Sequence, residues 1–102
     1  MAVLVGSFAS VTSVRAQGSD PSTGRRLAEA ECSGCHQIDP ASTTPRPNSA
    51  APSFIDISRM PSTNELAIKV FLRSSHPPMP DLILSRQEIN SITAYILALS
   101  QK

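Results

Sequence analysis

Two cysteines and a histidine stand within five consecutive residues, in the order Cys32-Ser33-Gly34-Cys35-His36. A C-x-x-C-H run is the attachment pattern of haem c. Two thiols three positions apart can each add to one vinyl group on the same edge of a porphyrin, and each addition forms a thioether bond. The next histidine is then held under the centre of the ring, where its imidazole can bind iron. The motif therefore predicts one covalently bound haem, attached through Cys32 and Cys35, with His36 as an iron ligand.

Three other interpretations of the motif lack the context that they need. A thioredoxin-like redox pair requires a βαβ unit around it, and the sequence has no strand pattern there. A zinc site usually takes four ligands, whereas the chain has two cysteines and two histidines in all. Cys35 and His36 are adjacent, which is poor geometry for one tetrahedral ion. A disulfide between Cys32 and Cys35 would close a very small loop and stabilise the chain little.

Residues 1–16 look like the later part of a secretory signal peptide. An apolar stretch runs from Ala2 to Val14, and small or permissive residues stand before a cleavage point after Ala16. The basic residues that open such a signal are missing, so a signal peptide truncated at its start and a short N-terminal tail both remain open. The stretch is too short and too rich in Ser and Thr for a membrane span. We therefore expect residues 1–16 to be a signal peptide and residues 17–102 to form one exported, periplasmic domain.

The charge of residues 17–102 excludes some partners. Without Arg15, eight basic and eight acidic residues remain, and the only lysines are Lys69 and Lys102. No basic field suggests nucleic acid, and no dense ring of lysines suggests strong electrostatic steering to an acidic partner. The chain also has four aromatic residues of the Phe and Tyr types and no Trp. This small number of large side chains is consistent with a core that a bound macrocycle completes.

The sequence predicts three main helices. Asp20 before Pro21 is a favourable helix entry, and the helix that follows runs into Cys32. Gly24 within it costs roughly 1 kcal/mol against alanine, so a close approach of another element and a tolerated surface glycine are both open. The run Ser62-Thr63-Asn64-Glu65 predicts a capping box for a second helix that continues to Arg73. The run Ser85-Arg86-Gln87-Glu88 predicts another box, before a last helix with Ile89, Ile92, Thr93, Ile96 and Leu99 on one face and Tyr95 beside it.

Two proline-rich segments separate these helices. Residues 39–52 contain four prolines and many Ser, Thr and Asn residues, which predicts a loop. It ends at Phe54 and Ile55, which are able to pack against a porphyrin. The second segment is His76-Pro77-Pro78-Met79-Pro80, where flanking prolines predict an extended, stiff loop. Such a loop could present the Met79 thioether to iron with little ordering cost.

These parts occur in the order found in small class I c-type cytochromes, which the chain resembles over about residues 20–100. The resemblance is carried by Gly24 with the C-x-x-C-H motif, by Ala51-Pro52-Ser53-Phe54, by the Pro-Met-Pro loop and by Ala94-Tyr95-Ile96-Leu97 in the last helix. It implies an all-α fold of three main helices and proline-rich loops wrapped around one covalently bound haem, with crossing N- and C-terminal helices. Family members often carry an aromatic residue at the position of Ala28, so we expect a smaller and looser helix crossing here.

The resemblance also implies the ligand set. His36 would be the proximal iron ligand and Met79 the distal one, which is the ligation of electron-transfer cytochromes c. The Pro52 carbonyl would accept a hydrogen bond from the other imidazole nitrogen of His36, and Gly24 would let the last helix approach near Tyr95. Met60 and His76 are weaker candidates for the distal site, since methionine commonly fills gaps and His76 lies in a loop.

These expectations together predict a monomeric periplasmic electron carrier that is not an enzyme. It would exchange single electrons with redox proteins such as a dehydrogenase, a reductase or a terminal oxidase, without nucleic acid and without stable membrane insertion after signal removal. Two alternatives remain open. One is a haem-based sensor of a small gas, for which Met79 would have to dissociate readily. The other is a dedicated electron-accepting subunit of one dehydrogenase or oxidase.

Overall fold

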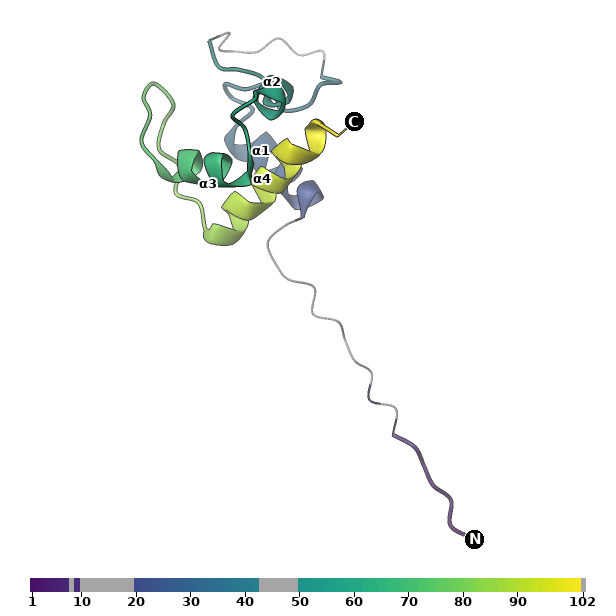
Figure 1. Ribbon diagram of the computed structural model, residues 1–102. Coiled ribbons are helices and arrows are strands. Elements are labelled where there is room, and N and C mark those ends of the chain that lie inside the picture. Colours follow the sequence, from purple (N-terminus) through teal and green to yellow (C-terminus); the bar gives the residue numbers. More distant parts are fainter. Residues whose placement is uncertain (8, 10–19, 43–49, 102) are drawn as a thin grey trace.

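Helices joined by loops make up the described part of the chain, which is residues 1–7, 9, 20–42 and 50–101 of a computed structural model. In chain order the helices are α1 (Pro21–Glu31), α2 (Phe54–Arg59), α3 (Glu65–Arg73) and α4 (Arg86–Leu99) (Figure 1). No strand occurs within these described residues. The prediction of an all-α fold is therefore confirmed.

Helix α4 is the element on which the other described helices pack. Each of α1, α2 and α3 contacts α4, and Figure 1 shows α1 passing behind it. The capping box of α4 is present: the Ser85 N–H donates to the Glu88 carboxylate over 2.8 Å, and the Glu88 N–H donates to the Ser85 hydroxyl over 3.1 Å. The buried residues of α4 include all those expected on its apolar face: Ile89, Ile92, Thr93, Tyr95, Ile96 and Leu99. The predicted start and buried face of the last helix are both confirmed.

Small side chains bring α1 close to α4. The Asp20 side chain accepts a hydrogen bond from the Ser22 N–H over 3.0 Å, and Pro21 occupies the first turn, as predicted. A Cβ added to Gly24 would collide with the backbone carbonyl of Ser91 and would lie 2.9 Å from the Tyr95 Cβ. Gly24 is thus a close-approach glycine, and the alternative of a tolerated surface glycine is wrong. Ala28 is also fully buried, so the crossing is small in side-chain volume but close at Gly24.

Helix α2 was not predicted from the sequence. Its first residue, Phe54, follows Ser53, whose hydroxyl accepts a hydrogen bond from the Asp56 N–H over 3.2 Å. A serine followed three residues later by an acidic residue is a helix-start signal, but only the end of the proline-rich loop was expected at Phe54 and Ile55. This short helix is an addition to the three main helices that were expected.

Helix α3 begins later than its predicted capping box. The N-cap is Asn64, whose side chain accepts from the Ala67 N–H over 2.8 Å, so the helix starts at Glu65. Ser62 is therefore not the cap. The reason is that Thr63 forms hydrogen bonds to residues earlier in the chain. Its hydroxyl donates to the Ile57 carbonyl over 2.6 Å, and its N–H donates to the Met60 carbonyl over 3.0 Å. These bonds keep Thr63 in the turn that follows α2.

The loop that carries Met79 is a tight reversal and is not extended as predicted. His76 and Met79 form an isolated antiparallel bridge on either side of Pro77 and Pro78, whose peptide bond is cis. Proline fixes φ at a value that suits a turn as well as an extended segment. The proline pattern alone therefore did not decide between the two conformations.

Residues 1–7 and 9 have no regular secondary structure, and apolar side chains there, such as Val3, Leu4 and Val5, are exposed. Across the parts of the chain that the structure describes, no helix is long and apolar enough to cross a membrane. The expected cleavage point after Ala16 lies outside the described residues. Residues 43–49 of the proline-rich loop, with Pro45, Arg46 and Pro47, also lie outside them.

Candidate functional site

The C-x-x-C-H motif follows α1 without a break. The Cys32 N–H donates to the Ala28 carbonyl over 2.8 Å and so continues the helical bonding of α1. The Cys32 carbonyl then accepts two bonds, from the Cys35 N–H over 3.2 Å and from the His36 N–H over 2.9 Å. These bonds fold the motif into consecutive turns, which bring Cys35 and His36 back to the end of the helix.

The two thiols have different surroundings. Cys32 is 5% exposed and belongs to the hydrophobic core, whereas Cys35 is exposed. Burial, together with the carboxylate of Glu31, raises the pKa of the Cys32 thiol to about 11, because a thiolate is poorly solvated there. The two cysteines are not joined to each other. One attachment point is therefore anchored in the core while the other faces outward.

A backbone carbonyl at the C-terminal end of the proline-rich loop orients the His36 ring. Its Nδ1 lies 2.7 Å from the Pro52 carbonyl oxygen. A carbonyl can only accept, so Nδ1 carries the proton and Nε2 keeps a free lone pair. The ring also contacts Phe54, with centroids 5.5 Å apart and planes tilted by 54°. The hydrogen bond expected between His36 and Pro52 is thus present, and Nε2 is the nitrogen available to iron.

Two further hydrogen bonds hold the backbone just after His36. The Phe54 N–H donates to the Gln37 carbonyl over 2.9 Å, and the Tyr95 hydroxyl donates to the Ile38 carbonyl over 2.7 Å. Burial, with the nearby Asp39 carboxylate as a smaller cause, raises the pKa of the Tyr95 hydroxyl, so it stays a donor at neutral pH. Helices α2 and α4 therefore both position the segment that carries His36.

An apolar face of α3 provides a surface that a porphyrin would cover. Leu66 is 71% exposed, Val70 54% and Phe71 51%, whereas Ile68, on the opposite side of the helix from Leu66 and Val70, is buried. Leu66 and Val70, four positions apart, lie one above the other on the helix, and Phe71 is the next residue after Val70. An apolar side chain loses roughly 1.5–3 kcal/mol of stabilisation when it is left in water. The exposed apolar face of α3, the two thiols and the free Nε2 of His36 together fit a covalently bound haem.

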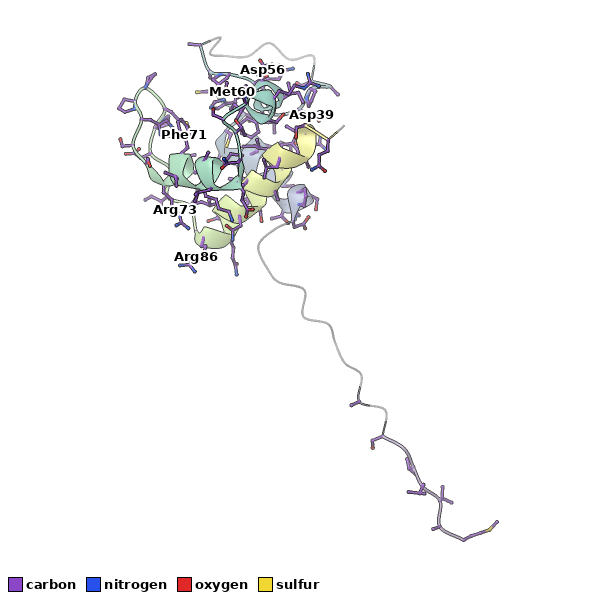
Figure 2. All side chains as sticks on the ribbon, viewed as in Figure 1. Asp39, Asp56, Met60, Phe71, Arg73 and Arg86 are labelled. Carbon is purple, nitrogen blue, oxygen red and sulfur yellow. The ribbon has the colours of Figure 1, made fainter. Side chains whose placement is uncertain are left out.

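Of the two other candidates for the distal ligand, His76 lies beside Met79, whereas Met60 lies in another part of the structure. Met79 is half-buried in the reversal after α3, and its Sδ lies 3.0 Å from Nε2 of His76. Phe71 of α3 points toward this reversal (Figure 2), where its ring lies against the His76 ring. Met60 is exposed at the C-cap of α2 and takes no part in this cluster.

The alternative interpretations of the motif find no support in this geometry. Among the described residues, no group of three or more His, Cys, Asp or Glu side chains lies together that could hold a metal ion such as zinc. A thioredoxin-like pair would sit beside a sheet, whereas Cys32 ends a helix that packs on another helix.

Comparison with known proteins identifies the family. The family model described as Cytochrome c matches residues 21–100. The chain therefore belongs to the cytochrome c family. No curated protein and no solved structure gives a significant match to the chain.

Membership of this family has direct consequences for cofactor and chemistry. Cytochromes c carry covalently bound haem c and use it for electron transfer. Cys32 and Cys35 are the only cysteines of the chain and have the spacing that attachment requires. Such domains are typically electron carriers rather than enzymes.

Apart from the bond between His36 and Pro52, the contacts that support the side chains of the site were not expected from the sequence. Tyr95 was singled out for its place in the last helix, but nothing in its surroundings marks it as a donor to Ile38, 57 positions away. The Ser53 cap, which sets Phe54 beside His36, had a local signal in Asp56 three residues later. The contact between His76 and Met79 had none, since it depends on the direction in which the loop turns.

Proposed function

We propose that the protein is an exported electron carrier whose haem iron is held by His36 and Met79. The observation that carries the proposal is the hydrogen bond from Nδ1 of His36 to the Pro52 carbonyl. It leaves Nε2 as the only free nitrogen of that ring. His36 directly follows the second of the two cysteines that would attach the haem. Second partners of this kind orient a metal-binding imidazole and raise its basicity.

The residues of the chain would act by holding the iron in one environment in both oxidation states. Bound haem c supplies the one-electron ferric/ferrous couple. His36 is tied to Pro52 and packed on Phe54, so its ring has little freedom to move. The apolar side chains of Leu66, Val70 and Phe71 would keep water from the ring face. A methionine ligand raises the reduction potential relative to two imidazoles, so Met79 would favour the ferrous state.

The same reasoning extends to partners and compartment. With both axial positions filled by side chains, no position is left for a substrate, so we expect no enzyme activity. The near-neutral charge of residues 17–102 suits brief encounters of a monomer with redox proteins such as a dehydrogenase, a reductase or a terminal oxidase. The exposed, unpacked apolar residues at positions 1–7 support a removable signal peptide over residues 1–16 and hence a periplasmic location.

An absorption spectrum of the exported, haem-loaded protein tests this proposal. We expect a haem c spectrum with the far-red ferric band of a methionine–iron bond, unchanged in its ferrous form by carbon monoxide. Met79→Ala should abolish the far-red band, whereas Met60→Ala should leave it intact. Persistence of the band in Met79→Ala would overturn the ligand assignment.

The same samples separate the two alternatives. Rapid binding of carbon monoxide by the unsubstituted protein would contradict a carrier and favour a sensor of small gases. Co-purification with one dehydrogenase or oxidase in a stable complex would indicate a dedicated subunit. Sedimentation as a single small species, with activity toward several redox partners, is the result expected of a free carrier.

A further inference from the structure

His76 has the same hydrogen-bonding arrangement as His36. Its Nδ1 lies 2.8 Å from the Ser74 carbonyl oxygen, which can only accept. In the neutral imidazole the proton is therefore on Nδ1, and Nε2 keeps a free lone pair. His36 donates in the same way to Pro52 over 2.7 Å. Each of the two histidines in the chain is thus held by a backbone carbonyl as an Nε2 ligand would be.

The free nitrogen of His76 lies next to the sulfur of Met79. The distance from Nε2 of His76 to Sδ of Met79 is 3.0 Å. Because the neutral Nε2 has no proton and a thioether sulfur has none either, the contact brings two electron-pair donors together. Directly paired residues of an antiparallel bridge also present their side chains on the same side of the backbone, and His76 and Met79 form such a bridge. The two donor atoms are therefore close enough to be alternative ligands for one coordination position.

The ring of His76 is held in this place from a second side. Phe71 of α3 lies against it, with ring centroids 3.5 Å apart and planes tilted by 38°. Phe71 is 51% exposed and points toward the reversal that carries His76 and Met79 (Figure 2). His76 therefore lies in one cluster with Met79, beside an exposed apolar residue of α3.

We propose that His76 is a second distal ligand, which takes the place of Met79 on the iron when the methionine leaves it. The proposal rests on the proposed function, in that His36 and the attached haem must be in place. In the exchange, the bond from Sδ of Met79 to iron breaks and a bond from Nε2 of His76 forms. No proton moves, because Nδ1 keeps its proton toward Ser74, and no electron is required.

Once Met79 has left the iron, His76 should replace it more readily in the ferric state than in the ferrous state. Thioether sulfur is a soft ligand and imidazole a harder one, so the loss of an electron from iron shifts the preference toward His76. Two imidazoles also lower the reduction potential relative to one imidazole and one methionine. A filled distal position would, in addition, keep carbon monoxide and similar gases from an iron that has lost Met79.

A comparison of haem-loaded variants tests the proposal by electron paramagnetic resonance of the ferric form and by carbon monoxide binding to the ferrous form. The variants are Met79→Ala, His76→Gln and the double variant Met79→Ala with His76→Gln. We expect Met79→Ala to be low-spin with the signature of two histidines. We expect the double variant to be high-spin and to bind carbon monoxide about tenfold faster or more, since its open state is no longer a minor population.

The chain contains two histidines, so a two-histidine spectrum within one molecule requires both His36 and His76. Dilution distinguishes this from a histidine donated by a second molecule. Lys69 of α3 is another residue whose nitrogen could bind iron, and it forms an ion pair with Glu65 over 2.5 Å. Lys69→Gln in the Met79→Ala background is therefore the matched control and should change nothing. His76→Gln alone should keep the far-red methionine band, which also shows that this variant folds.

Failure of the proposal and failure of the proposed function give different results. A high-spin ferric spectrum of Met79→Ala, equal to that of the double variant, would overturn the role of His76 while the unsubstituted protein kept its methionine band. A two-histidine spectrum of the unsubstituted protein would instead overturn Met79 as the resting ligand and support His76. Absence of attached haem would overturn both.

Discussion

The hydroxyl of Tyr95 lies 2.7 Å from the backbone carbonyl oxygen of Ile38 and donates a hydrogen bond to it. Both residues are buried, and Ile38 is two positions after His36. The bond therefore ties the helix at the centre of the fold to the segment that carries His36, the proposed proximal ligand. Through this contact the packing of α1 on α4 and the orientation of His36 depend on each other.

Removal of this hydroxyl should destabilise the protein. Tyr95→Phe leaves the Ile38 carbonyl without its partner, and an unsatisfied buried acceptor costs about 1–3 kcal/mol. Urea unfolding of the haem-loaded protein measures the loss. Ser100→Ala is the matched control, because its hydroxyl also donates to a carbonyl, that of Leu97, but in an exposed position. Equal effects of the two substitutions would contradict a special role for Tyr95.

The same residue should make stability depend on alkaline pH. Burial raises the pKa of Tyr95 in the folded protein, so the folded state holds the phenolic proton more tightly than the unfolded state. The contribution is complete below the unfolded pKa of about 10 and is lost as the pH rises from there through the raised pKa. Tyr95 is the only tyrosine, so nuclear magnetic resonance of a 13C-labelled tyrosine follows its titration directly. A pKa at or below 10, or the same alkaline loss of stability in Tyr95→Phe, would disagree with this account.

Gly24→Ala should lower stability although alanine is the better helix former. Helix propensity alone would stabilise α1 by about 1 kcal/mol. The added methyl group, however, collides with the Ser91 carbonyl and approaches the Tyr95 Cβ, and overpacking of this kind costs about 1–3 kcal/mol or more. A thermal unfolding midpoint below that of the unsubstituted protein is the expected sign. Gly34→Ala, where the methyl group meets nothing within 4 Å, should leave the midpoint almost unchanged.

Val70→Thr tests whether haem covers the apolar face of α3. The two side chains are similar in size and helix propensity, so an effect reports the surroundings of the new hydroxyl. Under a porphyrin that hydroxyl would lack a partner, and the loss of stability should be about 1–3 kcal/mol. A change within about 0.5 kcal/mol, as for an ordinary surface site, would show that Val70 stays in water in the haem-loaded protein.

The start of α3 can be checked with two polar residues. Asn64→Ala removes the cap that accepts from the Ala67 N–H and should cost about 1 kcal/mol. Ser62→Ala should cost little, because Ser62 lies in the turn before the cap. Urea unfolding of both variants gives the comparison, and the reverse order would restore Ser62 as the cap.

Several features could be predicted because their causes lie within a few residues. The spacing of Cys32, Cys35 and His36 is itself the chemical requirement for attachment. The caps at Asp20 and Ser85 act on N–H groups two or three positions away. The apolar face of α4 repeats at the helical period. Together these determined the helical class, the order of the main helices and the cofactor.

Other features became visible only in the folded structure, because neither a motif nor a hydrophobic period marks the contacts that produce them. Thr63 was drawn away from α3 by carbonyls of α2 and of the turn that follows it. Gly24 could have faced water or a helix, and the approach of Ser91 decided between them. The reversal that brings His76 onto Met79 followed a proline pattern compatible with two backbone paths. Local chemistry determined which groups this chain can use, whereas the path of the backbone and the packing of the helices decided which of them meet, because such contacts leave no motif or period in the sequence.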